Sequence, residues 1–220
     1  MAVESFIDLP SVAVVVGGTA IATLLRCGWS DCRLALSAVL GGRERFDADQ
    51  ARAELAVQVR AIQQDGLLRA NPRHLGDRAL DEVNEMLIST RSVEALVAKH
   101  ERQKARRQEA DNRAIRTWAQ AAELGPVFGL AGTLISLTEL PADGIAREAY
   151  MNAISMAVLC TFYGLILANF LLGPLSRLVE RAATKEERER QEIVDWLADQ
   201  VAPAIPKGGK PVVVPEAISA

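Results

Sequence analysis

The sequence has few of the residues from which catalytic centres and metal sites are built. Of its 220 residues, two are histidines, three are cysteines and 5% are aromatic. His74 falls in a predicted turn and His100 in a basic helical stretch, and no phosphate-binding loop or nucleophile motif occurs. Cys27 and Cys32 have no further Cys or His nearby, which favours reduced structural thiols over a metal site. We therefore expect neither an enzyme nor a metal or organic cofactor.

Charge is missing from three long stretches, although 24% of all residues are charged. Residues 9–25 carry no charge, 117–138 carry one, and 149–176 are uncharged over 28 residues. About 20 residues of helix cross a hydrocarbon core of about 30 Å. The pattern predicts an all-α integral membrane protein with three transmembrane helices and long cytoplasmic helical extensions. The alternative is a soluble protein with buried helices, but 28 uncharged residues are hard to bury in so small a chain.

The distribution of basic residues predicts the orientation in the membrane. Arginines follow the first uncharged run, the stretch KHERQKARR (99–107) precedes the second, and more basic residues follow the third, whereas the loop 139–148 has a single basic residue, Arg147. The positive-inside rule then gives an N-out, C-in topology. Glu4 and Asp8 precede the first run, which argues against a cleaved signal peptide. The expected domains are the outer N-terminus with the first transmembrane helix (1–26), a cytoplasmic helical domain (27–116), the second helix (117–138), a short external loop (139–148), the third helix (149–176), a cytoplasmic helix (177–202) and a flexible tail (203–220).

The predicted cytoplasmic part has helical periodicity. Asp47 or Asp49 is expected to cap a helix whose apolar positions include Leu55, Val59 and Ile62, and Pro72 and Gly76 in NPRHLGD (71–77) end this pattern. We expect one long helix from about Asp81 to Thr138, continuous with the second span. The basic run 99–107 fits a surface beside anionic lipid; nucleic-acid binding is the alternative, and we expect no nucleic-acid partner.

Small residues recur within the three runs. In hydrocarbon, helices associate where small side chains let their backbones approach. Candidate packing positions are Gly17, Gly18, Gly125, Gly129, Gly132 and Gly164. One chain with three spans cannot use all these surfaces on itself, so a homo-oligomer or a partner helix is expected.

Polar residues within the runs suggest an ion pathway. Thr133 lies in the middle of the second run and Thr161 in the third, with Ser155 and Asn169 about two turns to either side. Hydroxyls in membrane helices commonly bond their own i−4 carbonyl, so a shared polar track and separate local bonds both remain open. No acidic or basic residue lies deep in any run. If ions cross here, another chain must supply the titratable group.

Two motifs carry a resemblance to a known family. GPVFGLAGTLISL (125–137) and MAVLCTFYGLILANFLLGPLSRLVE (156–180) resemble the paired signature of the MotA/TolQ/ExbB proton-channel family, and FIDLPSVAVVVGGTAIATLL (6–25) resembles an earlier span of its MotA branch. The resemblance implies an inner-membrane motor, or stator, in which a pentamer surrounds two copies of a single-span MotB/ExbD/TolR-like partner. That partner supplies a membrane aspartate, and passage of protons, or of Na⁺, is converted into mechanical work.

Residue roles and departures follow from the same resemblance. Thr133 and Thr161 match pore-facing hydroxyls, and Pro126 and Pro174 match prolines that couple ion flow to movement. The three-span topology is that of ExbB and TolQ, yet Ser155 and its neighbour stand where those branches carry an acid. An envelope or surface machine, such as one for protein transport, is favoured over flagellar rotation. The alternative function is a non-conducting membrane scaffold that assembles a cell-envelope complex.

Overall fold

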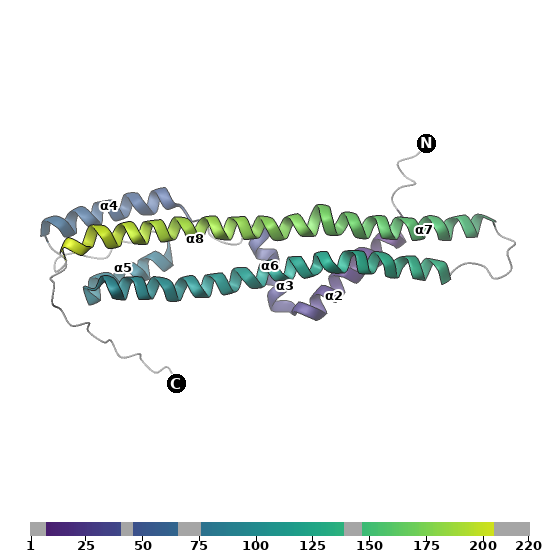
Figure 1. Cartoon of the computed structure of the whole chain (residues 1–220), viewed down its shortest axis with the longest axis horizontal. Coiled ribbons are helices and arrows are strands. Elements are labelled where there is room, and N and C mark those ends of the chain that lie inside the picture. The colour runs from purple at the N-terminus through teal and green to yellow at the C-terminus, as the bar shows by residue number, and fades with distance from the viewer. Residues whose placement is uncertain (1–7, 41–45, 66–75, 139–146, 205–220) are drawn as a thin grey trace, which may run out of the picture. The chain divides into compact units, whose positions relative to one another are not determined.

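The computed structural model describes residues 8–40, 46–65, 76–138 and 147–204, and every regular element in these ranges is a helix (Figure 1). The all-α prediction is therefore confirmed for this part of the chain. Most of the expected break at 71–77, most of the loop 139–148 and most of the tail 203–220 lie outside the described residues. The chain divides into two compact units, the first formed by residues 1–43 and 110–182 and the second by residues 44–109 and 183–220.

The first unit begins with an apolar helical rod in three segments. These are α1 (Leu9–Val12), the π-helical η2 (Ala13–Gly17) and α2 (Gly18–Cys27). The Asp8 carboxylate caps α1 by accepting the Ser11 N–H at 3.0 Å. Gly28 ends the rod with φ 82°, a conformation that glycine adopts without a Cβ clash. The chain turns there into α3 (Trp29–Leu40).

The other helices of this unit are long. They comprise the C-terminal part of α6 (Val93–Thr138), then α7 (Arg147–Ile166), the π-helical η4 (Leu167–Leu172) and the first part of α8 (Gly173–Val201). Within the described residues, three continuous helical stretches are long and apolar enough to cross a membrane, namely Leu9–Cys27, Val93–Thr138 and Arg147–Val201.

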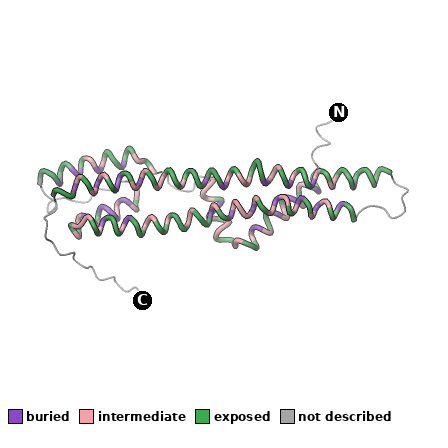
Figure 2. The backbone as a smooth tube through the Cα atoms, in the orientation of Figure 1, coloured by how far each residue is buried: buried purple, intermediate pink, exposed green. Residues whose placement is uncertain are grey.

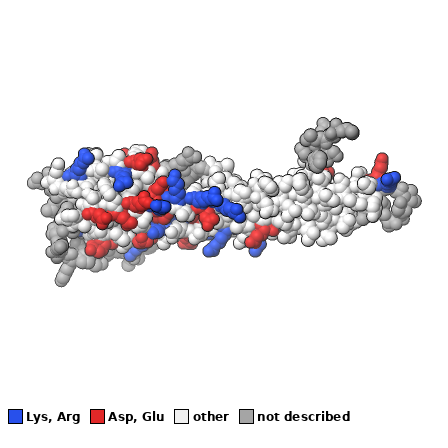
Figure 3. All heavy atoms as spheres, turned by 45° about the horizontal axis from the view of Figure 1, so that its top comes forward, with Lys and Arg blue, Asp and Glu red and all other residues white. Residues whose placement is uncertain are grey.

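The outer surfaces of these helices are apolar. Leu130 and Leu134 on α6 and Val158 on α7 are each at least 60% exposed. Figure 2 shows exposed residues along much of α7, and in Figure 3 the face in view has few charged atoms over the apolar spans. Exposed apolar area on this scale marks a surface that lipid or other helices cover.

Helix α3 is fixed to α6 by two polar contacts and a small apolar cluster, and one of these contacts is the ion pair of Asp31 with Arg113 at 3.7 Å. The Trp118 indole Nε1–H donates to the Ala35 carbonyl at 3.0 Å. Ala35, Ala114 and Val179 are each less than 5% exposed and pack together there.

The second unit is built around α4 (Ala48–Asp65), α5 (Arg78–Thr90) and parts of α6 and α8, with a short 3₁₀ turn, η5 (Ala202–Ala204), at the end of α8. Leu55, Val59 and Ile62 are buried, as the periodicity of α4 predicts. Asp47 caps this helix, because its carboxylate accepts the backbone N–H groups of residues 49 and 50 at 3.1 and 3.0 Å. Both the helix and one of its two candidate caps are therefore confirmed.

The prediction of one helix from Asp81 to Thr138 is wrong. Arg91 adopts a left-handed conformation with φ 55° and ends α5, and its N–H donates to the Leu87 carbonyl at 2.8 Å. Ser92 then caps α6 by accepting the Ala95 N–H at 3.2 Å. After the break the chain begins a new helix, and Leu96 in its first turn is fully buried. Local bonds at Arg91 and Ser92 thus replace the continuous ladder of a single helix.

Part of the basic run 99–107 faces protein and not lipid, while Arg102 and Arg106 are exposed, so that a lipid-facing surface stays a prediction for those two. Lys99 pairs with Glu82 of α5 at 3.1 Å, and Arg107 forms a two-pronged pair with Glu187 of α8, both contacts at 2.9 Å. His100 is 1% exposed and lies 3.2 Å from the amide oxygen of Gln191. These side chains hold the second unit together, because acidic and amide partners on α5 and α8 satisfy them.

Candidate functional site

Helices α6 and α7 meet along a line of small residues that we call the small-residue seam, formed by Gly125, Gly129, Gly132, Cys160, Gly164 and Ala168. A Cβ atom at Gly164 would lie 2.7 Å from the Gly125 carbonyl oxygen and 3.0 Å from the Gly129 Cα. A Cβ at Gly129 would lie 2.9 Å from the Cys160 carbonyl oxygen. Any larger residue at these glycines would force the backbones apart, so the seam sets the spacing of the two helices.

The first span packs against one side of this helix pair. A Cβ at Gly132 would lie 3.5 Å from Val14 Cγ1, and a Cβ at Gly18 would run into the ring of Phe128. On α7, the Tyr163 hydroxyl accepts the Asp8 N–H at 3.4 Å. These contacts identify the sides of α6 and α7 that face the first span.

Gly17 differs from the other predicted packing glycines. A Cβ built on it would meet no described atom within 4 Å. Adjacent positions on a helix point about 100° apart, and here Gly18 is the position directed at Phe128. A run of two glycines does not indicate which one faces a neighbour.

The two mid-span threonines lie on the side of the seam away from the first span. Successive residues of a helix are about 100° apart around its axis. Measured from Gly129 around α6, Thr133 lies about 40° to one side. Gly132, which approaches Val14, lies about 60° to the other side. Measured from Gly164 around α7, Thr161 lies about 60° to one side. Tyr163, which contacts the first span, lies about 100° to the other side. The Thr161 Cα would be 3.4 Å from a Cβ at Gly129, so this residue borders the seam.

Each of these polar groups bonds its own helix. The Thr133 hydroxyl donates to the Leu130 carbonyl at 2.6 Å, and the Thr161 hydroxyl to the Ala157 carbonyl at 3.5 Å. Asn169 likewise donates its amide to the Leu165 carbonyl at 2.9 Å. In such pairings the hydroxyl proton is used locally, while the hydroxyl oxygen keeps lone pairs that can accept a bond from water or coordinate a cation.

Ser155 and Asn169 do not join the threonines in one line. Ser155 is exposed and lies about 180° from Gly164 around α7. Asn169 is also exposed and lies within η4, whose wider π turns shift its direction relative to an ideal α-helix. The structure therefore groups Thr133 with Thr161 and separates the other two residues from them.

The two prolines occupy different backbone settings. Pro126 lies inside α6, which continues through it, and its missing N–H leaves the carbonyl of residue 122 without the usual helical donor. Pro174 comes two residues after η4. Neither π-helical segment was predicted from the sequence; Pro174 was the available signal near η4, because a proline perturbs the hydrogen bonds of the preceding turn.

The chain is similar to known proteins in sequence and in fold. Residues 71–192 match the model of the MotA/TolQ/ExbB proton channel family. The chain is 25% identical to Motility protein A of Cereibacter sphaeroides over 89% of its own length and 78% of that protein, and 25% identical to Motility protein A of Aquifex aeolicus (96% and 84%). It superposes on a chain of the flagellar MotAB stator complex from Bacillus subtilis with a TM-score of 0.81 at 15% identity, covering 94% of this chain and 83% of that one.

Proposed function

The chain belongs to the MotA/TolQ/ExbB proton channel family, and we propose that it is the ring-forming stator subunit of an ion-driven motor. Its relatives in Cereibacter sphaeroides and Aquifex aeolicus are motility proteins, and the chain from Bacillus subtilis that it resembles is part of a stator complex. These likenesses support the motility branch over the envelope-transport branch that the sequence features favoured. This chain then forms one wall of an ion path, and other chains complete the path.

The observation that carries the proposal is the placement of Thr133 and Thr161. Both border the small-residue seam on the side away from the first span, so a second copy or a partner helix can approach them. Residues 124–138 and 149–176 contain no charged side chain. A carboxylate that takes up and releases the ion must then come from a partner, and isolated charges in hydrocarbon are costly enough that such a group is functional.

The proposed assembly has five copies of this chain around two copies of a single-span MotB-like protein with an aspartate in its membrane helix. The chain is placed N-out and C-in in the bacterial inner membrane, with the second unit in the cytoplasm. Protons are the proposed ion, and Na⁺ is the alternative, because hydroxyl oxygens suit both a water relay and a hard cation. Pro126 and Pro174 are the proposed points at which helices bend as the ring moves.

The test is to reconstitute the chain with its single-span partner in vesicles and follow ion uptake with a pH-sensitive dye under an imposed membrane potential. We expect uptake only when both proteins are present, and loss of uptake when the partner's membrane aspartate is replaced by asparagine. Counting subunits in the purified complex tests the ring of five. A complex that assembles normally but shows no ion uptake would support the non-conducting scaffold instead.

A further inference from the structure

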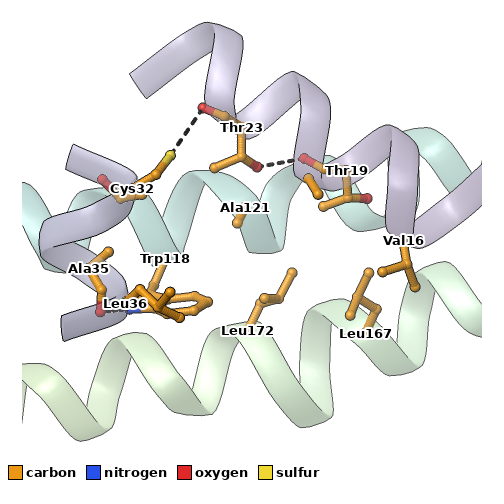
Figure 4. A pocket seen from close by; sticks show the side chains of 12 residues that line it. Val16, Thr19, Thr23, Cys32, Ala35, Leu36, Trp118, Ala121, Leu167 and Leu172 are labelled. Carbon is orange, nitrogen blue, oxygen red and sulfur yellow. Dashed lines mark hydrogen bonds between the residues drawn. The ribbon is translucent and has the colours of Figure 1, made fainter. Parts of the chain in front are cut away.

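An apolar groove opens beside the end of the first span, between α2, α3, α6 and η4 (Figure 4). Its cavity volume is ≈ 280 Å³, and its walls include Val16, Thr19, Leu36, Trp118, Leu167 and Leu172. For scale, an engineered apolar cavity of about 150 Å³ holds a benzene molecule. The groove is therefore large enough for a flexible hydrocarbon chain, but too small for a helix about 10 Å across.

Most polar groups in its walls are already bonded to the protein. The Thr23 hydroxyl donates to the Thr19 carbonyl at 2.7 Å, and the Trp118 indole N–H donates to Ala35. The Thr19 hydroxyl is the exception, since it is buried and has no hydrogen-bond partner among the described residues. The walls thus offer an apolar ligand extensive contact and a polar ligand only this one hydroxyl.

The groove runs from the level of α3 into the span. Along α2 and η2, its wall extends from Thr23 to Val16, a rise of about 10 Å at 1.5 Å per residue. At the α3 end it is bounded by Leu36 and Trp118. Tryptophan is enriched where a membrane meets water, so this end fits the interface and the Val16 end fits the hydrocarbon.

Helix α3 has the surface of an interfacial helix. Trp29, Leu36 and Leu40 are 73%, 51% and 74% exposed, and with Arg33 they follow the spacing of a single helical face. Arg33 is exposed, forms no ion pair with any described residue, and lies one turn before Leu36 of the groove wall. A cation one helical turn from the wall of an apolar groove complements an anionic headgroup attached to an acyl chain.

We propose that the groove holds one acyl chain of an anionic glycerophospholipid and that Arg33 binds its phosphate. This lipid site depends on the three spans lying in a membrane but not on ion conduction. Lipid binding and the proposed ion-driven motor can therefore be tested separately. The lipid would fill the corner between α2 and α3 and fix the depth of α3 in the interface.

The experiment uses Trp118 as the reporter, because its ring lies in the groove wall. Replacing the other two tryptophans, Trp29→Phe and Trp196→Phe, leaves a single emitter in the full chain. The chain, assembled with its partner, is placed in phosphatidylcholine nanodiscs, and phosphatidylglycerol with brominated acyl chains is added. We expect Trp118 emission to be quenched at low mole fractions of the brominated lipid. An absence of quenching in the assembled complex would show that the acyl chain does not enter the groove and would overturn the proposal.

A matched pair of substitutions tests whether quenching comes from the groove. Ala20 lines the groove and is exposed, whereas Ala13 is exposed on the same rod but does not line it. Ala20→Leu should fill the groove and reduce quenching, and Ala13→Leu should leave it unchanged. Equal quenching in the two variants, with helicity unchanged by circular dichroism, would contradict the assignment.

Two further variants separate the headgroup from the chain. Arg33→Gln should lower the preference for phosphatidylglycerol over phosphatidylcholine by about fivefold, the usual effect of one basic residue at an anionic membrane surface. Thr19→Val, which is nearly isosteric and more apolar, should keep or strengthen quenching. An unchanged lipid preference in the first variant, or a loss of quenching in the second, would mean that a different ligand occupies the groove.

Discussion

Replacing Gly164 by alanine tests whether the small-residue seam sets the spacing of α6 and α7. The added Cβ would lie 2.7 Å from the Gly125 carbonyl oxygen and 3.0 Å from the Gly129 Cα, so backbone atoms and not flexible side chains must move. Overpacking of this kind costs about 1–3 kcal/mol, while alanine gains about 0.5–1 kcal/mol over glycine within a helix. The difference predicts that Gly164→Ala destabilises the fold by about 1 kcal/mol, and by about 2.5 kcal/mol at most.

The same substitution at Gly17 is the matched control. A Cβ there meets no described atom within 4 Å, so Gly17→Ala should retain the helical gain of about 0.5–1 kcal/mol and be neutral or stabilising. The assay is unfolding of the full chain in mixed micelles of rising SDS fraction, followed by circular dichroism. The midpoint is expected to fall for Gly164→Ala and to stay or rise for Gly17→Ala. If Gly164→Ala were as stable as Gly17→Ala, the close packing at the seam would be refuted.

Three further predictions concern the second unit and its helix break, each measured as a midpoint of thermal or denaturant unfolding. Arg190 is 5% exposed and contacts the Asp77 carboxylate at 2.9 and 2.5 Å and that of Glu186 at 3.1 Å. Arg190→Met should cost about 3 kcal/mol because both carboxylates lose their cation. Adding Asp77→Asn should recover part of the loss. An additive double variant would argue against the pairing. Burial lowers the pKa of His100 below its ordinary 6.5, against the opposing Gln191 hydrogen bond. The unfolded chain therefore takes up this proton first, and stability falls as the pH drops below about 6.5. His100→Gln should flatten that slope, and an unchanged slope would contradict a neutral buried ring. Arg91→Gly should stabilise the chain by about 1 kcal/mol by relieving the left-handed conformation, whereas a loss of stability would show that the arginine side chain matters more there.

The apolar spans and the core of α4 were predictable because their signals are local in the sequence. Uncharged runs of sufficient length indicate spans, and the spacing of Leu55, Val59 and Ile62 indicates the buried face of one helix. The small residues within the uncharged runs also indicated the glycines that the structure places at the seam. Such features depend on residue type and period, which a single sequence contains.

The remaining features depend on tertiary context. Arg91 carries no sign of a left-handed conformation, because arginine is a good helix former and the break arises from local capping and packing. The charges of the run 99–107 were visible, but their partners on α5 and α8 were not. Likewise, the side of the seam on which Thr133 and Thr161 lie follows only from contacts with the first span.

The most direct test of the central claim is ion uptake by the reconstituted complex when both mid-span hydroxyls are removed. The variant is Thr133→Val with Thr161→Val, and the control is Thr138→Val, whose hydroxyl makes the same kind of bond to its own helix, at 2.7 Å, at the end of α6. Circular dichroism and co-purification of the partner establish that each complex is assembled. We predict that the double variant loses most of its ion uptake while the control conducts as the parent does. Uptake at the parental level in an assembled double variant would contradict the assignment of these threonines to the ion path.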